Sequence, residues 1–231
     1  MTDTKPLAVV TGASSGIGFE LAKQFAGNGF DLLVNAEDEG IGSAAGQLRA
    51  AGAHVQSVRV DLSTYEGVEE LYVAIVSTGR PVSAAALNAG VGQGGAFVDT
   101  DLADELRIID LNVTSTVHLA KRLLRDMVAR DDGRVLITSS IASTMPGSFQ
   151  AVYNASKSFL QSFAQALQNE LKDTEVTITS LMPGPTETNF FHRADMDDTA
   201  VGQGAKDDPA QVAKQGFDAL MAGKERISGA R

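Results

Sequence analysis

The chain has 231 residues, of which 43 % are hydrophobic and 21 % charged, a balance that is typical of a globular protein and excludes a disordered or membrane-embedded one. The formal net charge of −10 disfavours nucleic acids and anionic membranes as partners, because both are negatively charged. Without cysteine, and with only three scattered histidines, the sequence excludes disulfides and predicts no metal site.

Short apolar runs alternate with helix-length segments. The runs predict buried strands, because both faces are apolar and turn residues bound them: Leu7–Val10, Asp31–Val34, Val55–Val60, Ala84–Leu87, Val135–Thr138 and Val176–Leu181. The intervening segments predict helices over Gly16–Ala26, Ser43–Ala50, Tyr65–Ser77, Leu102–Arg130 and Ala151–Lys172, and a last one after Pro209. This alternation indicates βαβ units. We therefore expect a three-layer α/β fold, with a doubly wound parallel sheet, as a single domain over residues 1–231.

Glycine is over-represented, with 23 of 231 residues, and three glycines follow the first strand directly. Gly12 would allow a sharp turn, Gly16 a close approach of the backbone to a phosphate, and Gly18 close packing of the next helix on the sheet. The N–H groups and positive dipole end of that helix would then face a dinucleotide pyrophosphate. Any tight turn between a strand and a helix favours glycine, so this motif alone also allows a purely structural turn.

Polar and small residues end the other strands as well. Asp61 follows the third strand, where a carboxylate can accept from an adenine amine, and Asn88 and Gly90 follow the fourth, where a ribose can pass. Pro183 and Gly184 form a rigid turn after the sixth. Each of these could be an ordinary turn. Since ligands in open α/β sheets lie outside the carboxyl ends of the strands, their shared location predicts a ligand site.

Tyr153 and Lys157 lie four residues apart, on one face of the longest late helix. A tyrosine with a pKa of ~10 is a poor base at neutral pH, and a nearby ammonium lowers that pKa. Ser139 and Ser140 end the fifth strand at the same sheet edge, where a hydroxyl can hold a substrate oxygen beside the phenol. The alternative is a tyrosine–lysine pair on the helix surface without function. No histidine and no Gly-x-Ser-x-Gly elbow accompanies Ser139 and Ser140, so these serines do not indicate a serine hydrolase.

Thr-Gly-x-x-x-Gly-x-Gly (11–18), Asn-Ala-Gly (88–90), Asn112, Ser140, Tyr-x-x-x-Lys (153–157) and Pro-Gly (183–184) occur here in one order. In this combination the chain resembles the classical short-chain dehydrogenase/reductase family over nearly its whole length. The resemblance implies a Rossmann fold and a catalytic tetrad of Asn112, Ser140, Tyr153 and Lys157. Tyr153 would exchange a proton with the substrate oxygen that Ser140 fixes. Lys157 would hold the nicotinamide ribose and lower the pKa of Tyr153, and Asn112 would position a water that relays protons to Lys157. Ser140, rather than Ser139, stands at the family's offset from the tyrosine.

The resemblance also implies contacts to the cofactor around the whole site. The expected cofactor-binding residues are Gly12, Ser14, Ser15, Gly16, Ile17, Gly18, Glu37, Asp61, Leu62, Asn88, Ala89, Gly90, Tyr153, Lys157, Pro183, Gly184, Thr186 and Thr188. The second strand ends in Glu37, Asp38 and Glu39 with no basic residue, and a carboxylate there suits ribose hydroxyls, whereas a 2′-phosphate needs Arg or Lys. We therefore expect NAD rather than NADP, although the family's usual acidic position aligns with Ala36.

These features predict an NAD(P)-dependent oxidoreductase that transfers a hydride between nicotinamide and a small alcohol or ketone. The alternative is a catalytically silent dinucleotide-binding regulatory protein, against which the complete Ser140, Tyr153 and Lys157 set argues. Family resemblance implies a homodimer or homotetramer. No basic, apolar leader and no apolar run of ~20 residues is present, so we expect a cytoplasmic protein.

The substrate is expected near Val91–Phe97 and Ile141–Gln150 and beneath the segment at residues 185–208. The last of these is rich in aspartate and poor in apolar residues, which is typical of a solvated loop. Because it follows Pro183 and Gly184, which the resemblance places over the nicotinamide, we expect it to act as a substrate lid.

Overall fold

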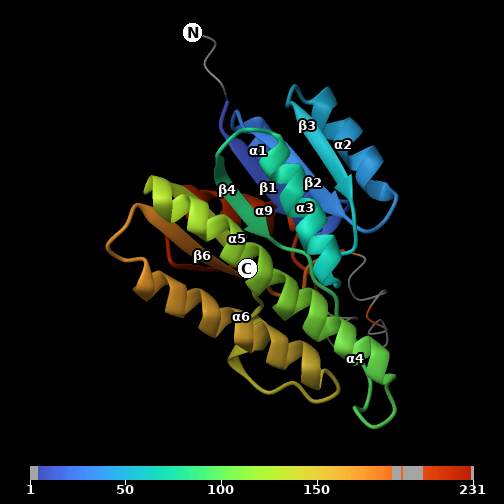
Figure 1. Cartoon of the computed structure of the whole chain (residues 1–231). Coiled ribbons are helices and arrows are strands. Elements are labelled where there is room, and N and C mark those ends of the chain that lie inside the picture. The colour runs from blue at the N-terminus through green and yellow to red at the C-terminus, as the bar shows by residue number, and fades with distance from the viewer. Residues whose placement is uncertain (1–4, 189–193, 195–204, 230–231) are drawn as a thin grey trace.

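Within the residues that the structure describes, 5–188, 194 and 205–229, the computed structural model has one parallel sheet of seven strands (Figure 1). The strands are β1 (Leu7–Thr11), β2 (Asp31–Ala36), β3 (Val55–Arg59), β4 (Val82–Leu87), β5 (Gly133–Thr138), β6 (Val176–Met182) and β7 (Arg226–Ser228). Their order is β3-β2-β1-β4-β5-β6-β7, which confirms the predicted doubly wound α/β fold. The order reverses between β1 and β4, and ligands bind at the carboxyl ends of the strands at such a point.

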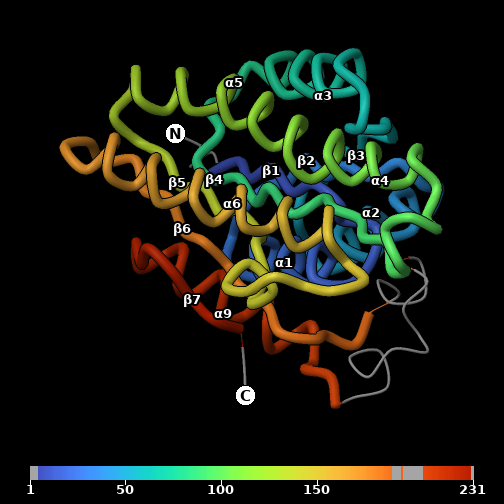
Figure 2. The backbone as a smooth tube through the Cα atoms, turned by 90° about the horizontal axis from the view of Figure 1, so that it is seen from below, coloured from blue at the N-terminus to red at the C-terminus, as the bar shows by residue number. Residues whose placement is uncertain are grey.

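Helices cover both faces of the sheet. They are α1 (Gly16–Gly27), α2 (Gly40–Ala50), α3 (Tyr65–Ser77), α4 (Leu102–Ile108), α5 (Ser115–Arg130), α6 (Ala151–Glu170) and α9 (Pro209–Met221). Figure 2 shows α3 and α5 on one side of the strands and α1 and α9 on the other. Successive strand residues point to opposite faces, so Val10 packs in the core beneath α1 and α9, and Val9 in the core beneath α3 and α5. The three predicted layers are therefore present.

The helix predicted over Leu102–Arg130 is the largest local difference. It is divided into α4, one turn of π-helix over Ile109–Thr114, and α5. A π-turn holds one extra residue in the helical ladder and occurs frequently at functional sites. Asn112 lies in this turn and is fully buried, so it marks a local distortion of the helix.

The two ends of the segment predicted as a lid, residues 185–208, lie side by side. The Asp207 N–H donates to the Pro185 carbonyl over 2.7 Å, and the Glu187 N–H donates to the Asp207 carbonyl over 2.9 Å. Most of the segment between them lies outside the described residues. The last predicted helix begins at Pro209, where Asp208 accepts from the Ala210 N–H as its N-cap.

None of the helices in the described ranges is both long and apolar enough to cross a membrane.

Candidate functional site

A cleft of about 520 Å³ opens at the carboxyl ends of the strands, within the size range of ligand sites. All of the residues expected to contact the cofactor line it, from Gly12 in the first turn to Thr188 after β6. Ser139 and Ser140 line it as well, whereas Asn112 does not. Val91 and residues 141–150, expected near the substrate, also contribute to its wall, apart from Ser143 and Phe149.

The backbone of the glycine-rich turn requires glycine at two of its positions. Gly12 and Gly16 have φ angles of +65° and +57°, which glycine adopts without strain. Helix α1 begins at Gly16, its N-cap Ser15 makes no side-chain capping hydrogen bond, and its first turn contains no acidic residue. The first N–H groups of α1 and its positive dipole end therefore suit an anion such as a pyrophosphate.

Gly18 provides a test of this turn. A Cβ atom there would lie 2.1 Å from the Gly12 carbonyl oxygen, so Gly18→Ala must displace backbone. We expect it to lower the free energy of unfolding by about 1–3 kcal/mol and to weaken dinucleotide binding. Gly27, in the last turn of the same helix, has nothing within 4 Å of such a Cβ. Gly27→Ala is the matched control and should be neutral or stabilising by up to about 1 kcal/mol. Urea unfolding and calorimetric titration with NAD⁺ measure both effects, and equal effects of the two changes would contradict the argument.

Asn88 joins the ends of three strands. Thr11 Oγ1 accepts from the backbone N–H groups of Asn88 and Ala89, each over 3.0 Å. The Asn88 amide donates to the Thr11 carbonyl over 3.3 Å and accepts from Thr138 Oγ1 over 3.1 Å. These bonds hold the ends of β1, β4 and β5 in a fixed relation. The main role of Asn88 is therefore to hold these three strand ends together at the base of the cleft.

Tyr153, Ser140 and Lys157 meet in one wall of the cleft. The hydroxyls of Tyr153 and Ser140 share a hydrogen bond. Lys157 Nζ donates to the Thr138 carbonyl over 3.0 Å and lies 5.8 Å from the centre of the Tyr153 ring. The neighbouring Ser139 is buried and donates to the Lys157 carbonyl over 3.0 Å. Ser140 is thus the serine beside the phenol, and Ser139 fixes β5 to α6.

Burial sets the pKa values of this pair. It raises the pKa of Tyr153 to about 12, against the opposing effect of the hydrogen bond with Ser140. It also lowers the pKa of Lys157 to about 8. The net pKa of Tyr153 is thus raised and that of Lys157 lowered, because the loss of solvent disfavours the charged form of each group. The effect of Lys157 on the pKa of Tyr153 stays a prediction. At neutral pH the phenol is protonated and suited to giving up a proton.

Asn112 is held behind the cleft by three hydrogen bonds. Its Oδ1 accepts from the Val91 N–H over 2.9 Å, and its Nδ2 donates to the Val91 carbonyl over 2.9 Å and to Ser156 Oγ over 3.0 Å. A Cβ atom on Gly90 would lie 3.1 Å from Asn112 Oδ1 and 3.4 Å from Lys157 Nζ. The missing side chain of Gly90 thus leaves a space that both groups face.

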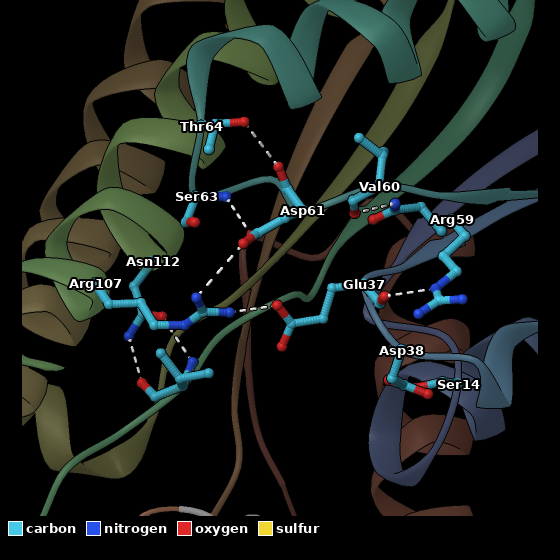
Figure 3. A network of polar contacts seen from close by, with 12 residues as sticks. Ser14, Glu37, Asp38, Arg59, Val60, Asp61, Ser63, Thr64, Arg107 and Asn112 are labelled. Atoms are coloured by element: carbon cyan, nitrogen blue, oxygen red, sulfur yellow. Dashed lines mark hydrogen bonds and ion pairs between the residues drawn. The ribbon is translucent and has the colours of Figure 1, made fainter.

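Two cations that the local sequence did not indicate lie behind the acidic residues after β2. Arg107, in α4, forms ion pairs with Glu37 and with Asp61, the latter over 3.4 Å (Figure 3). Arg59 donates to the Glu37 carbonyl and pairs with Glu39, each over 3.1 Å. The segment after β2 contains no basic residue, but the fold brings two guanidinium groups to it.

Asp38 and Ser14 also pair in this region. Ser14 Oγ donates to Asp38 Oδ2 over 2.7 Å, and the Gly40 N–H donates to Asp38 Oδ1 over 2.8 Å. The hydroxyl of Ser14, which was expected to contact the cofactor, therefore bonds to a carboxylate here. Asp38 lines the cleft and was not among the expected contacts. Its position immediately after Glu37 was the available signal.

Comparisons with known proteins agree on one family. Residues 6–199 match the family model of the short chain dehydrogenases. The uncharacterized oxidoreductase YmfI of Bacillus subtilis is 29 % identical over 189 residues, which are 80 % of this chain and 77 % of that protein. A short-chain dehydrogenase from Sphingobium yanoikuyae, solved in complex with NADPH, superposes with a TM-score of 0.90 at 26 % identity, over 96 % of this chain and 87 % of that one. A short-chain dehydrogenase/reductase from Burkholderia phymatum, solved with NAD, gives 0.89 at 26 % identity, over 99 % and 90 %.

The relatives are described as oxidoreductases or dehydrogenases, which gives no support to a silent regulatory protein. Their structures hold phosphorylated and unphosphorylated nicotinamide cofactors, so a dinucleotide is supported without a choice between the two. The family match indicates chemistry at C–OH and C=O groups. The position of the cleft, at the switch point of the sheet, agrees with it. The chain belongs to the short-chain dehydrogenase family and is an oxidoreductase that uses a nicotinamide dinucleotide.

Proposed function

We propose that this enzyme interconverts a ketone and a secondary alcohol, with Tyr153 as the proton donor and acceptor. The observation that carries the proposal is the hydrogen bond between Tyr153 and Ser140 in the wall of the cleft that begins at the glycine turn. A bound nicotinamide would supply or accept the hydride. Ser140 orients the substrate oxygen toward the phenol, which gives a proton to that oxygen in reduction and takes it back in oxidation.

In the reduction direction Tyr153 is the proton donor. With burial raising it to about 12, the phenol holds its proton at neutral pH and serves as a general acid. Lys157 is proposed to hold the nicotinamide ribose, and Asn112 to hold a water in the space beside Gly90.

A panel of ketones and alcohols, each followed by the absorbance of the reduced cofactor, tests the proposed reaction. Absence of turnover with every carbonyl of the panel would contradict the proposal.

We further propose that the enzyme prefers NAD. Glu37, Asp38 and Asp61 all line the adenosine end of the cleft, and carboxylates suit the ribose hydroxyls while repelling a 2′-phosphate. Arg59 and Arg107 offset part of this charge, but four carboxylates, those of Glu39 and the three above, outnumber two guanidinium groups. Comparison of kcat/KM for NADH and NADPH measures the preference.

The substrate wall beside Tyr153 favours a neutral carbonyl compound. Residues 141–150 carry no charged side chain, and Ile141, Met145 and Pro146 present apolar groups to the cleft. A carboxylate placed against this wall would lose hydration without gaining an ionic partner from it. We therefore propose an uncharged, largely apolar ketone as the substrate class.

A matched pair of substrates tests this class. We expect kcat/KM for 2-heptanone to exceed that for 6-oxoheptanoate, which has the same carbon chain and a terminal carboxylate, by about tenfold or more. Met145→Lys should narrow this ratio, because its ammonium provides the missing partner. Met145→Leu, the uncharged control, should leave the ratio unchanged. A faster reaction of the keto acid with the unmodified enzyme would contradict the proposed class.

A further inference from the structure

Arg107 links two carboxylates that come from different strands. Its guanidinium forms an ion pair with Glu37, at the end of β2, and a longer contact of 3.4 Å with Asp61, after β3 (Figure 3). Both carboxylates line the cleft, and Arg107 itself does not. All three side chains are partly exposed. The cation therefore stands just behind the acids that face the adenosine end.

Arg59 approaches Glu37 as well. Its Nε donates to the Glu37 carbonyl over 3.1 Å, and its Nη1 pairs with Glu39 over 3.1 Å. Two guanidinium groups from β3 and α4 thus converge on one residue. As long as Glu37 is ionised, its carboxylate satisfies Arg107 and presents negative charge to the ligand.

Guanidinium groups bind phosphate in the same forked geometry in which they bind carboxylate. We propose that Arg107, assisted by Arg59, is a latent ligand for the 2′-phosphate of NADP, which Glu37 keeps occupied. The inference rests on the proposed preference for NAD. Arg107 is then a specificity-determining residue: it positions Glu37 for the ribose hydroxyls, and it becomes available to a phosphate when the Glu37 charge is removed.

Binding of NAD⁺ and NADP⁺ to four proteins tests the inference by isothermal titration calorimetry without substrate, so that turnover plays no part. The proteins are the unmodified enzyme, Glu37→Gln, Arg107→Gln and the double variant. We expect the unmodified enzyme to bind NAD⁺ more tightly. Glu37→Gln should bind NADP⁺ about tenfold more tightly than the unmodified enzyme, which is about 1.4 kcal/mol, and the double variant should lose most of that gain. Arg107→Gln alone should weaken NAD⁺ binding by several-fold and give no gain in NADP⁺ binding.

Arg122→Gln is the matched control, since Arg122 pairs with Glu69 between α3 and α5 and does not line the cleft. It should change neither dissociation constant. If the double variant keeps the gain of Glu37→Gln, or if Glu37→Gln gains nothing, the role of Arg107 is overturned while the preference for NAD stands. Tighter binding of NADP⁺ by the unmodified enzyme overturns both the preference and the inference.

Discussion

Tyr153→Phe is expected to lower kcat by about 10²- to 10⁴-fold, the usual contribution of a positioned acid or base. Phenylalanine keeps the ring and removes only the hydroxyl that bonds with Ser140. The substrate oxygen then lacks its proton donor, while the glycine turn and the adenosine end of the cleft are unchanged. We therefore expect the dissociation constant of the dinucleotide to stay within about twofold.

Steady-state turnover, followed by the absorbance of the reduced cofactor, measures kcat, and calorimetric titration measures the dissociation constant of the dinucleotide. Tyr72→Phe is a matched control, because Tyr72 lies in α3 with its hydroxyl bonded to Asp126, outside the cleft. It should retain full activity. Substantial turnover by the Tyr153→Phe enzyme would overturn the proposed mechanism, whereas loss of cofactor binding would show that the change disturbs the site more widely than its geometry indicates.

The site residues found from the sequence are those whose signals are local. The glycine turn stands directly between a strand and a helix, and Tyr153 and Lys157 share a helical face through their spacing. Parallel connection then brings separate strand ends to one edge of the sheet, which is why residues as distant as Gly12 and Gly184 line the same cleft. Local pattern and sheet topology together therefore predict most of the candidate cofactor site.

Contacts between distant segments could not be predicted in this way. Arg59 and Arg107 reach Glu37 from 22 and 70 residues away in the sequence, and neither stands in a motif. The acids after β2 therefore indicated a region of purely negative charge, whereas the fold places both positive and negative groups there.

Two elements were missed for other reasons. The π-turn at Asn112 leaves the hydrophobic pattern of a long helix unchanged, because one extra residue shifts its phase only locally. Strand β7 has only three residues, Arg226–Ser228, and its first and last are exposed. It is an edge strand specified by its pairing with β6, in which Leu181 aligns with Ile227, and its own composition carries little signal.

Burial of Lys157, the proposed ribose-binding residue, reduces the stability of the fold. The residue is only 5 % exposed, and burial lowers its pKa from 10.5 to about 8. The unfolded chain therefore binds this proton more tightly than the folded one. The contribution of Lys157 to the free energy of unfolding therefore rises as the pH increases from about 8 to about 10.5, by up to about 3 kcal/mol, and its destabilising effect is complete below pH 8.

Lys157→Met removes the charge and keeps the length of the side chain. The variant loses the hydrogen bond to the Thr138 carbonyl, which costs about 1 kcal/mol. It also avoids burial of the ammonium, so we expect a net stabilisation of about 2 kcal/mol at pH 7 together with a loss of turnover. Urea unfolding at pH 7 and pH 10 measures the difference in the free energy of unfolding between the variant and the unmodified enzyme. This difference should shrink at the higher pH, because the lysine is neutral there in the folded state.

The control is Lys121→Met, on the exposed side of α5, which should give the same small difference at both pH values. A Lys157→Met enzyme that is less stable than the unmodified one at pH 7, or whose difference does not change with pH, would contradict this account. Stabilisation with loss of activity would instead show that the buried ammonium is retained for catalysis at the expense of the fold.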